Sequence, residues 1–138
     1  SGRFHIIHTD RYTIIDDCYN ANPVSMKASL DVLSDALGEK TAILGDMGEL
    51  GEDQVEMHRE VGVYAASKNI DRILCVGPLS AYMAEAARLT APAKEIRHFE
   101  SKEELLEVLP EILKKGDNVL VKASHFMEFG KILEALQE

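Results

Sequence analysis

Residues 41–76 read TAILGDMGELGEDQVEMHREVGVYAASKNIDRILCV, and their pattern indicates a class of fold. Short apolar runs at 41–44 and 72–76 are typical of buried strands. Between them, a loop with three glycines at 45–51 leads into a helix over 53–68, for which the inward-facing candidates are Val55, Val61 and Ala65. Parallel strands need a crossover of a dozen or more residues, which is usually a helix. This segment therefore predicts two parallel strands joined by a helix.

The alternation of strand and helix continues toward the C-terminus. Gly77-Pro78 leads into a predicted helix over 79–89, and a weaker strand pattern follows at 96–99. A capping box at 101–104 (SKEE) predicts the start of a further helix. A strand is expected at 119–121 and an amphipathic helix at 126–136. The apolar face of the helix after the capping box consists of Leu105, Leu106, Leu109 and Ile112.

The segment before residue 41 adds a hairpin and a helix. Two β-rich runs at 4–7 and 12–15 are separated by the polar residues 8–11, which predicts an antiparallel hairpin. Asn22 has the features of a helix N-cap, because Pro at the first helical position follows it. The helix is expected to end at Gly38, and its apolar face consists of Met26, Leu30, Leu33 and Leu37.

Together these elements predict an α/β fold in one domain over residues 1–138. The expected architecture is a Rossmann-like, doubly wound, mostly parallel sheet with helices on both faces and a hairpin strand at its N-terminal end. The chain starts at Ser1 without an initiator Met and runs directly into a strand pattern, so we expect it to be a piece of a longer protein.

Composition excludes several classes of partner. The chain has 138 residues, of which 46% are apolar, and its net charge is −9. Nucleic acids and anionic membranes bind through Lys and Arg, so an acidic domain fits neither. No apolar run reaches the roughly 18–20 residues of a membrane span. Cys18 and Cys75 form no CxxC pair, which favours a reducing cytoplasm as the location of the protein. Separately, we expect the protein to be a monomer.

Three polar segments follow predicted strands, where an open α/β sheet binds its ligands. They are DDCYNANP at 16–23, GDMGELG at 45–51 and KASH at 122–125. Packing alone would not select these residues after apolar runs. We therefore expect the three segments to form a ligand site.

The first segment offers carboxylates and amides. One of Asp16 and Asp17 could accept hydrogen bonds from sugar hydroxyls or help to hold a metal, since alternation along a strand points the two to opposite sides. The pattern leaves open which of the two faces the ligand, and both could simply decorate a strand end. Asn20 and Asn22 could contact an amide or a base edge, although Asn22 could also cap the helix.

The other two segments suit a zwitterion. Asp46 and Glu49 could hold an ammonium group, whereas Lys122 and Ser124 could hold a carboxylate. As a bare loop, GDMGELG could equally be a turn, and a lysine at a strand end is usually solvated. GDMGELG is not a Walker sequence, because no Lys-Ser or Lys-Thr follows its last glycine. The histidines show no metal-ligand spacing, so we expect no metal site.

The order of these motifs is specific. DxYNANPxSM at 17–26 and LGDMxELG at 44–51 are followed by His58 and Gly62 as HxxxG, and later by VKAS at 121–124. Over its whole length the chain resembles the C-terminal domain of the Mur ligase family. Within that family it is most similar to the members that add D-alanyl-D-alanine to UDP-MurNAc-tripeptide.

The resemblance implies an ATP-dependent amide ligase of peptidoglycan synthesis, and hence of cell-wall biogenesis, that uses Mg²⁺. Such enzymes phosphorylate the carboxylate of the UDP-linked tripeptide, and the amine of the dipeptide then displaces phosphate. They have an N-terminal UDP-sugar domain, a central ATPase domain and this C-terminal domain. No GxxxxGK[ST] sequence occurs here, so we expect the chain to be inactive alone and to carry neither catalytic residues nor a metal site.

The resemblance also implies roles for individual residues. It assigns ATP binding to Arg3, Asp17, Asn20 and Asn22. It assigns dipeptide binding to Asp46, Met47, Glu49, Lys122 and Ser124, with His58 and His125 supporting the site. Relatives commonly have KGSR where this chain has KASH, so His125 replaces an arginine.

Two alternatives remain at this level. The chain could be a stand-alone module that binds a nucleotide or an amino acid without catalysis. It could also come from a related ligase with another amine acceptor, such as a folate–glutamate enzyme, but the combination of the two motifs argues against this.

Overall fold

A computed structural model describes residues 5–138 and confirms the alternation of strands and helices. Phe4 and Arg3 lie outside the described residues. The strands are β1 (His5–His8), β2 (Thr13–Asp17), β3 (Lys40–Gly45), β4 (Arg72–Val76), β5 (Glu95–Phe99) and β6 (Asn118–Lys122). The helices are α1 (Pro23–Ser34), α2 (Gln54–Ser67), α3 (Ser80–Thr90), α4 (Lys102–Ile112) and α5 (Gly130–Leu136), with 3₁₀ turns η1 (Gly51–Asp53) and η2 (His125–Met127).

The six strands form one sheet in the order β1-β2-β6-β3-β4-β5. β1 pairs antiparallel with β2, which confirms the predicted hairpin, and all other pairs are parallel. β6 lies between β2 and β3, and Lys122 at its end is in register with Asp17 of β2 and Leu44 of β3. The carboxyl ends of these three strands, and the three polar segments that follow them, therefore lie side by side.

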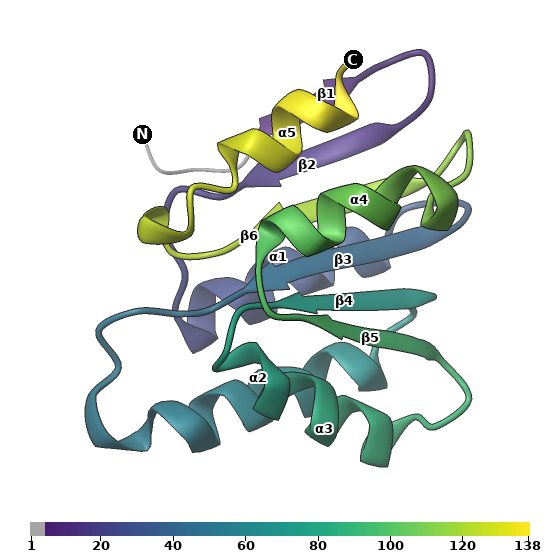
Figure 1. Cartoon of the computed structure of the whole chain (residues 1–138). Helices are drawn as coiled ribbons and strands as arrows, with labels where there is room; N and C mark the ends of the chain where they lie inside the picture. Colours follow the sequence, from purple (N-terminus) through teal and green to yellow (C-terminus); the bar gives the residue numbers. More distant parts are fainter. Residues whose placement is uncertain (1–4) are drawn as a thin grey trace.

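Helices cover both faces of the sheet, as predicted for a doubly wound fold (Figure 1). Successive strand residues point to opposite faces, so Ile15 and Leu44 pack in the core under α1, α2 and α3. Ile14 and Ile43 pack in the other core, under α4 and α5. Each of these four side chains is at least 96% buried, and burying one contributes roughly 1.5–3 kcal/mol.

Both predicted N-caps are present. The Asn22 side chain accepts from Ser25 N at 2.9 Å, and Ser25 Oγ accepts from Asn22 N at 3.0 Å, which makes a full capping box. Ser101 Oγ accepts from Glu104 N at 3.3 Å. The Glu104 carboxylate, however, accepts from Glu100 N rather than from Ser101 N.

Two helix boundaries differ from the sequence-based prediction. α1 ends at Ser34, so Leu37 was wrongly placed on its apolar face and is 92% exposed. The predicted helix over 126–136 begins only at Gly130, because Glu128 adopts a left-handed conformation (φ 55°) that separates η2 from α5. Within residues 5–138, no helix is long and apolar enough to cross a membrane.

Candidate functional site

A cavity of about 460 Å³ lies among the loops that follow β2, β3 and β6. We call it the three-loop cavity. Each loop leaves its strand at the carboxyl edge of the sheet, which is where ligands bind in open α/β folds. Its lining residues are Asn20, Ala21, Asn22, Gly48, Glu49, Leu50, Ser124, His125 and Phe126.

Ser124 ties the three loops together. Its Oγ accepts a hydrogen bond from Gly48 N at 2.7 Å and donates one to Ala21 O at 3.4 Å. Its own N–H donates to Asp46 O at 3.2 Å. One hydroxyl at the end of β6 therefore sets the spacing of the cavity walls.

Glu49 is the carboxylate of the three-loop cavity. Its backbone is in the left-handed region (φ 58°), which costs energy for a non-glycine residue. Its side chain is exposed and forms no hydrogen bond or ion pair with residues 5–138. The loop thus holds a free negative charge at the cavity.

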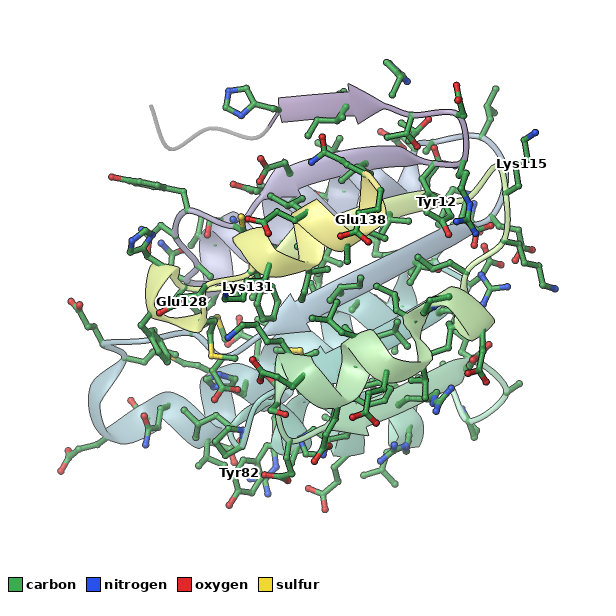
Figure 2. All side chains as sticks on the ribbon, turned by 45° about the horizontal axis from the view of Figure 1, so that its top comes forward. Tyr12, Tyr82, Lys115, Glu128, Lys131 and Glu138 are labelled. Carbon is green, nitrogen blue, oxygen red and sulfur yellow. The ribbon has the colours of Figure 1, made fainter. Side chains whose placement is uncertain are left out.

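A second cavity, of about 520 Å³, lies between the end of β2 and the start of α5, and we call it the β2–α5 cavity. Figure 2 shows Glu128 and Lys131 together at this end of α5, whereas Glu138 lies at the other end. Further lining residues used below are Asp16, Asp17, Cys18, Tyr19 and His125.

Asp17 is held in this cavity by a buried network. Its Oδ2 atom accepts from Lys122 Nζ at 2.7 Å and from Ser29 Oγ on α1. Lys122 also donates to Asn20 O at 3.0 Å. Among residues 5–138 no hydrogen bond involves Asp17 Oδ1, so one carboxylate oxygen is anchored and the other has no protein partner there.

An aromatic pair stands where the two cavities meet. The rings of Tyr19 and His125 have centroids 5.9 Å apart and are tilted by 57°. His125 lines both cavities, and among residues 5–138 it is the one basic side chain that lines the three-loop cavity.

Asp46, Met47 and His58 lie behind the three-loop cavity. The buried Asp46 carboxylate accepts from Leu79 N at 3.2 Å and from Ser80 N and Oγ at 2.8 Å, so it caps α3 from a different strand. His58 is fully buried, and its Nε2 accepts from Met47 N at 3.0 Å. Its Nδ1 lies 2.7 Å from Gln54 O, which assigns the proton to Nδ1. His58 therefore supports the loop from behind.

Cys18 is a poor nucleophile despite lining a cavity. Burial, followed by hydrogen bonding to Asp16, raises the pKa of the Cys18 thiol to about 12. Its Sγ donates to Asp16 Oδ1 at 3.2 Å. Asp16 is thereby turned toward the backbone at 18 and its thiol, while Asp17 joins the Lys122 network.

The structure divides the predicted site residues into three groups. Asn20, Asn22, Glu49, Ser124 and His125 line the three-loop cavity, so the asparagines predicted for ATP lie with residues predicted for the dipeptide. Asp17 lies in the other cavity. The residues set behind the walls are Asp46, Met47, His58 and Lys122. Arg3 lies outside the described residues.

Sequence reasoning missed Ser29, Tyr19 and Phe126. Ser29 carried a signal, because it is a polar residue between the apolar positions Met26 and Leu30 on the inner face of α1. Tyr19 and Phe126 are more than 60% exposed although aromatic, and only the assembled loops show that they flank the cavities.

The described residues do not fit a metal ion. Within residues 5–138, no group of three His, Cys, Asp or Glu side chains is arranged to hold one. Asp16 and Asp17 point their carboxylates to different partners, so they do not converge on a common point. We therefore derive no metal-dependent step from this chain.

This chain is similar to known proteins in both its sequence and its structure. A Bacillus subtilis (strain 168) UDP-N-acetylmuramoyl-tripeptide–D-alanyl-D-alanine ligase is 37% identical over 99% of this chain and 30% of its own length. The ligase of the same name from Escherichia coli (strain K12) is 33% identical over 98% of the chain and 29% of its own length. The chain thus spans less than a third of the curated relatives it matches.

Solved structures of Mur ligases are also similar to this chain. MurF from Acinetobacter baumannii has a TM-score of 0.89 and 31% identity over 99% of this chain and 30% of its own. MurF ligase from Thermotoga maritima in complex with ADP has a TM-score of 0.81 and 30% identity, with the same coverage. E. coli FolC, at 20% identity and a TM-score of 0.61, shares only the fold.

The family follows from a direct match along the sequence. A model described as "Mur ligase, glutamate ligase domain" matches residues 2–125, which include all three polar loops up to the start of η2. The chain belongs to the Mur ligase family.

Proposed function

We propose that this chain is the C-terminal domain of an ATP-dependent ligase that joins D-alanyl-D-alanine to UDP-MurNAc-tripeptide. One observation carries the proposal: three loops remote in sequence meet in a cavity that holds a free carboxylate, two amides, a hydroxyl and a histidine. The B. subtilis and E. coli ligases named for this reaction match 99% and 98% of the chain.

The three-loop cavity is assigned to the dipeptide. A dipeptide is a zwitterion, and Glu49 supplies a charge that can hold its ammonium group. His125, on the opposite loop, is suited to its carboxylate, and Ser124 holds that loop against the other two. Asn20 and Asn22 line the same wall, so we place them at the boundary between dipeptide and nucleotide.

The β2–α5 cavity is assigned to the nucleotide sugar. Asp17 Oδ1 can accept hydrogen bonds from ribose hydroxyls while Oδ2 stays anchored. Arg3 is assigned to the phosphates on the resemblance alone. Asp46, Met47, His58 and Lys122 act indirectly, because they shape the walls rather than line them.

The reaction needs more than this domain. The tripeptide carboxylate takes the γ-phosphoryl group of ATP, and attack by the dipeptide amine forms the amide and releases phosphate. We propose that the P-loop and any Mg²⁺ site lie elsewhere in the longer protein, and that the isolated chain does not ligate. The domain then contributes orientation, which can supply several kcal/mol of catalysis.

The assignment is tested by Asp17→Ala and Ser124→Ala in the full-length protein. Asp17→Ala is expected to raise KM for ATP about tenfold or more, because an acceptor for two hydroxyls is lost. Ser124→Ala is expected to raise KM for D-alanyl-D-alanine by a similar factor. Asp10→Ala and Ser67→Ala, at exposed positions away from both cavities, are the matched controls.

The outcomes separate family from site. Ligation of D-alanyl-D-alanine by the unchanged protein supports the function, whereas binding of a nucleotide or amino acid without ligation would support the stand-alone module. Unchanged steady-state kinetics in both cavity variants would show that the site is misassigned even if the reaction is right.

A further inference from the structure

Lys122 is a buried lysine at the end of the central strand β6. Its side chain is 1% exposed, and its ammonium lies between β2 and the loop that follows it. It lines neither cavity. A charge in this position is costly unless it is fully paired, so its partners indicate its role.

The charged partner of Lys122, Asp17, belongs to the nucleotide side of the site, whereas its other partner, Asn20, lines the three-loop cavity. Lys122 Nζ bonds Asp17 Oδ2 at 2.7 Å and Asn20 O at 3.0 Å. Ser29 Oγ donates to the same carboxylate oxygen from α1. Residues of two elements, β6 and α1, therefore hold one oxygen of Asp17, which restricts rotation of the carboxylate.

We propose that Lys122 is a positioning residue for the nucleotide sugar, rather than a group that holds the dipeptide carboxylate. The proposal rests on the assignment of Asp17 to ribose. Lys122, together with Ser29, fixes the direction of Asp17 Oδ1 before the nucleotide arrives. To bind a group in the three-loop cavity, the ammonium would have to leave the buried Asp17 carboxylate.

The two possible roles of Lys122, positioning Asp17 or holding the dipeptide carboxylate, predict opposite changes in the two KM values. A lysine that holds the dipeptide carboxylate changes KM for D-alanyl-D-alanine when it is removed. A lysine that orients Asp17 changes KM for ATP, and it does so without touching the nucleotide. Loss of stability alone lowers the amount of active protein and moves neither KM.

The experiment compares Lys122→Met, Lys122→Arg and Ser29→Ala in the full-length protein. Lys122→Met is expected to raise KM for ATP about tenfold, since a misdirected acceptor loses its hydrogen bonds, and to leave KM for D-alanyl-D-alanine within about twofold. Lys122→Arg keeps a cation at this position and is expected to recover part of the ATP affinity. Ser29→Ala removes one anchor and is expected to raise KM for ATP about threefold.

Lys40→Met is the matched control. Lys40 is 5% exposed and its Nζ donates to Gly38 O at 2.9 Å, at the opposite end of β3 from the site. Its loss is expected to leave both KM values unchanged. If Lys122→Met does not fold, as judged by circular dichroism, Ser29→Ala carries the test through the same oxygen.

A rise in KM for the dipeptide, with KM for ATP unchanged, would overturn the proposal. It would also be overturned if both Lys122→Arg and Ser29→Ala behaved like the unchanged protein. Failure of the underlying assignment is distinguishable, because in that case Asp17→Ala itself leaves KM for ATP unchanged.

Discussion

Glu49 and Glu128 are the non-glycine residues with positive φ within residues 5–138, and each lines a cavity. The left-handed conformation costs a non-glycine residue about 1 kcal/mol or more. An exposed side chain that gains no hydrogen bond does not offset this cost. Because Glu49 also lines the cavity assigned to the dipeptide, we propose the ammonium group of that ligand as its partner.

Glu49→Gly separates strain from function. The substitution is expected to raise the free energy of unfolding by up to about 1 kcal/mol, because glycine adopts this φ freely. It is also expected to raise KM for D-alanyl-D-alanine about tenfold, because the ammonium loses its carboxylate. Urea unfolding and steady-state kinetics measure the two effects.

Glu128→Gly is the control for Glu49→Gly. It relieves the same strain in the other cavity and is expected to leave KM for the dipeptide unchanged. A more stable Glu49→Gly variant with normal dipeptide kinetics would show that Glu49 has no ligand role.

Cys18 tests the electrostatics of the β2–α5 cavity. A thiol whose pKa is about 12 is about one part in ten thousand thiolate at pH 8, so alkylation by iodoacetamide is expected to be far slower than for free cysteine. Asp16→Asn removes a charge that raises the pKa and is expected to speed the reaction. Alkylation of the unchanged chain at the rate of free cysteine would contradict this description.

At the scale of elements, α3 depends on a residue of another strand. The N-terminus of α3 has no side-chain cap of its own. The Asp46 carboxylate, at the end of β3, accepts hydrogen bonds from Leu79 N and Ser80 N at this helix start. Gly77, with φ 114°, leaves room for this carboxylate, because a Cβ there would lie 2.5 Å from Asp46 Oδ1. The charge of Asp46 therefore stabilises a helix start.

Asp46→Ala is expected to lower the free energy of unfolding by about 2 kcal/mol, since a buried cap is lost and its donors are left unpaired. Asp46→Asn keeps an acceptor oxygen and is expected to lose less. Urea unfolding of the chain checks both values. Equal stability of Asp46→Ala and the unchanged chain would exclude the capping role.

At the scale of the whole molecule, α2 and α3 pack at a distance that only glycine permits. A Cβ on Gly62 would lie 2.1 Å from Met83 O of α3, so the HxxxG spacing noted in the sequence is a packing motif as well. Gly62→Ala is expected to lower the free energy of unfolding by about 2 kcal/mol, because overpacking outweighs the better helix propensity of alanine.

Gly130→Ala is the control for Gly62→Ala. Gly130 begins α5, and a Cβ there meets nothing within 4 Å. The substitution is expected to be neutral or to add up to about 1 kcal/mol. Comparable losses in the two variants, measured by urea unfolding, would argue against a close crossing.

The local pattern of apolar and polar residues was sufficient to predict the order of the elements along the chain, the parallel sheet with its hairpin and the helices on both faces. The reason is that apolar periodicity encodes which side of an element is buried. The same pattern also located the three polar loops, because glycine and polar residues directly after an apolar run indicate that a strand has ended. Helix ends were less predictable. Leu37 continues the helical spacing, yet α1 ends at Ser34, and the left-handed Glu128 that delays α5 carries no signal in its residue type.

Charge in the sequence indicated that Asp46, Glu49 and Lys122 belong near a ligand, and all three do lie at the carboxyl edge of the sheet. Their division into a free carboxylate, a helix cap and a buried ion pair arises only from tertiary contacts. Asp46 meets α3 and Lys122 meets β2, 34 and 105 residues away along the chain. A residue type specifies what a side chain can bond, but which partner satisfies it depends on the strands that the fold places beside it.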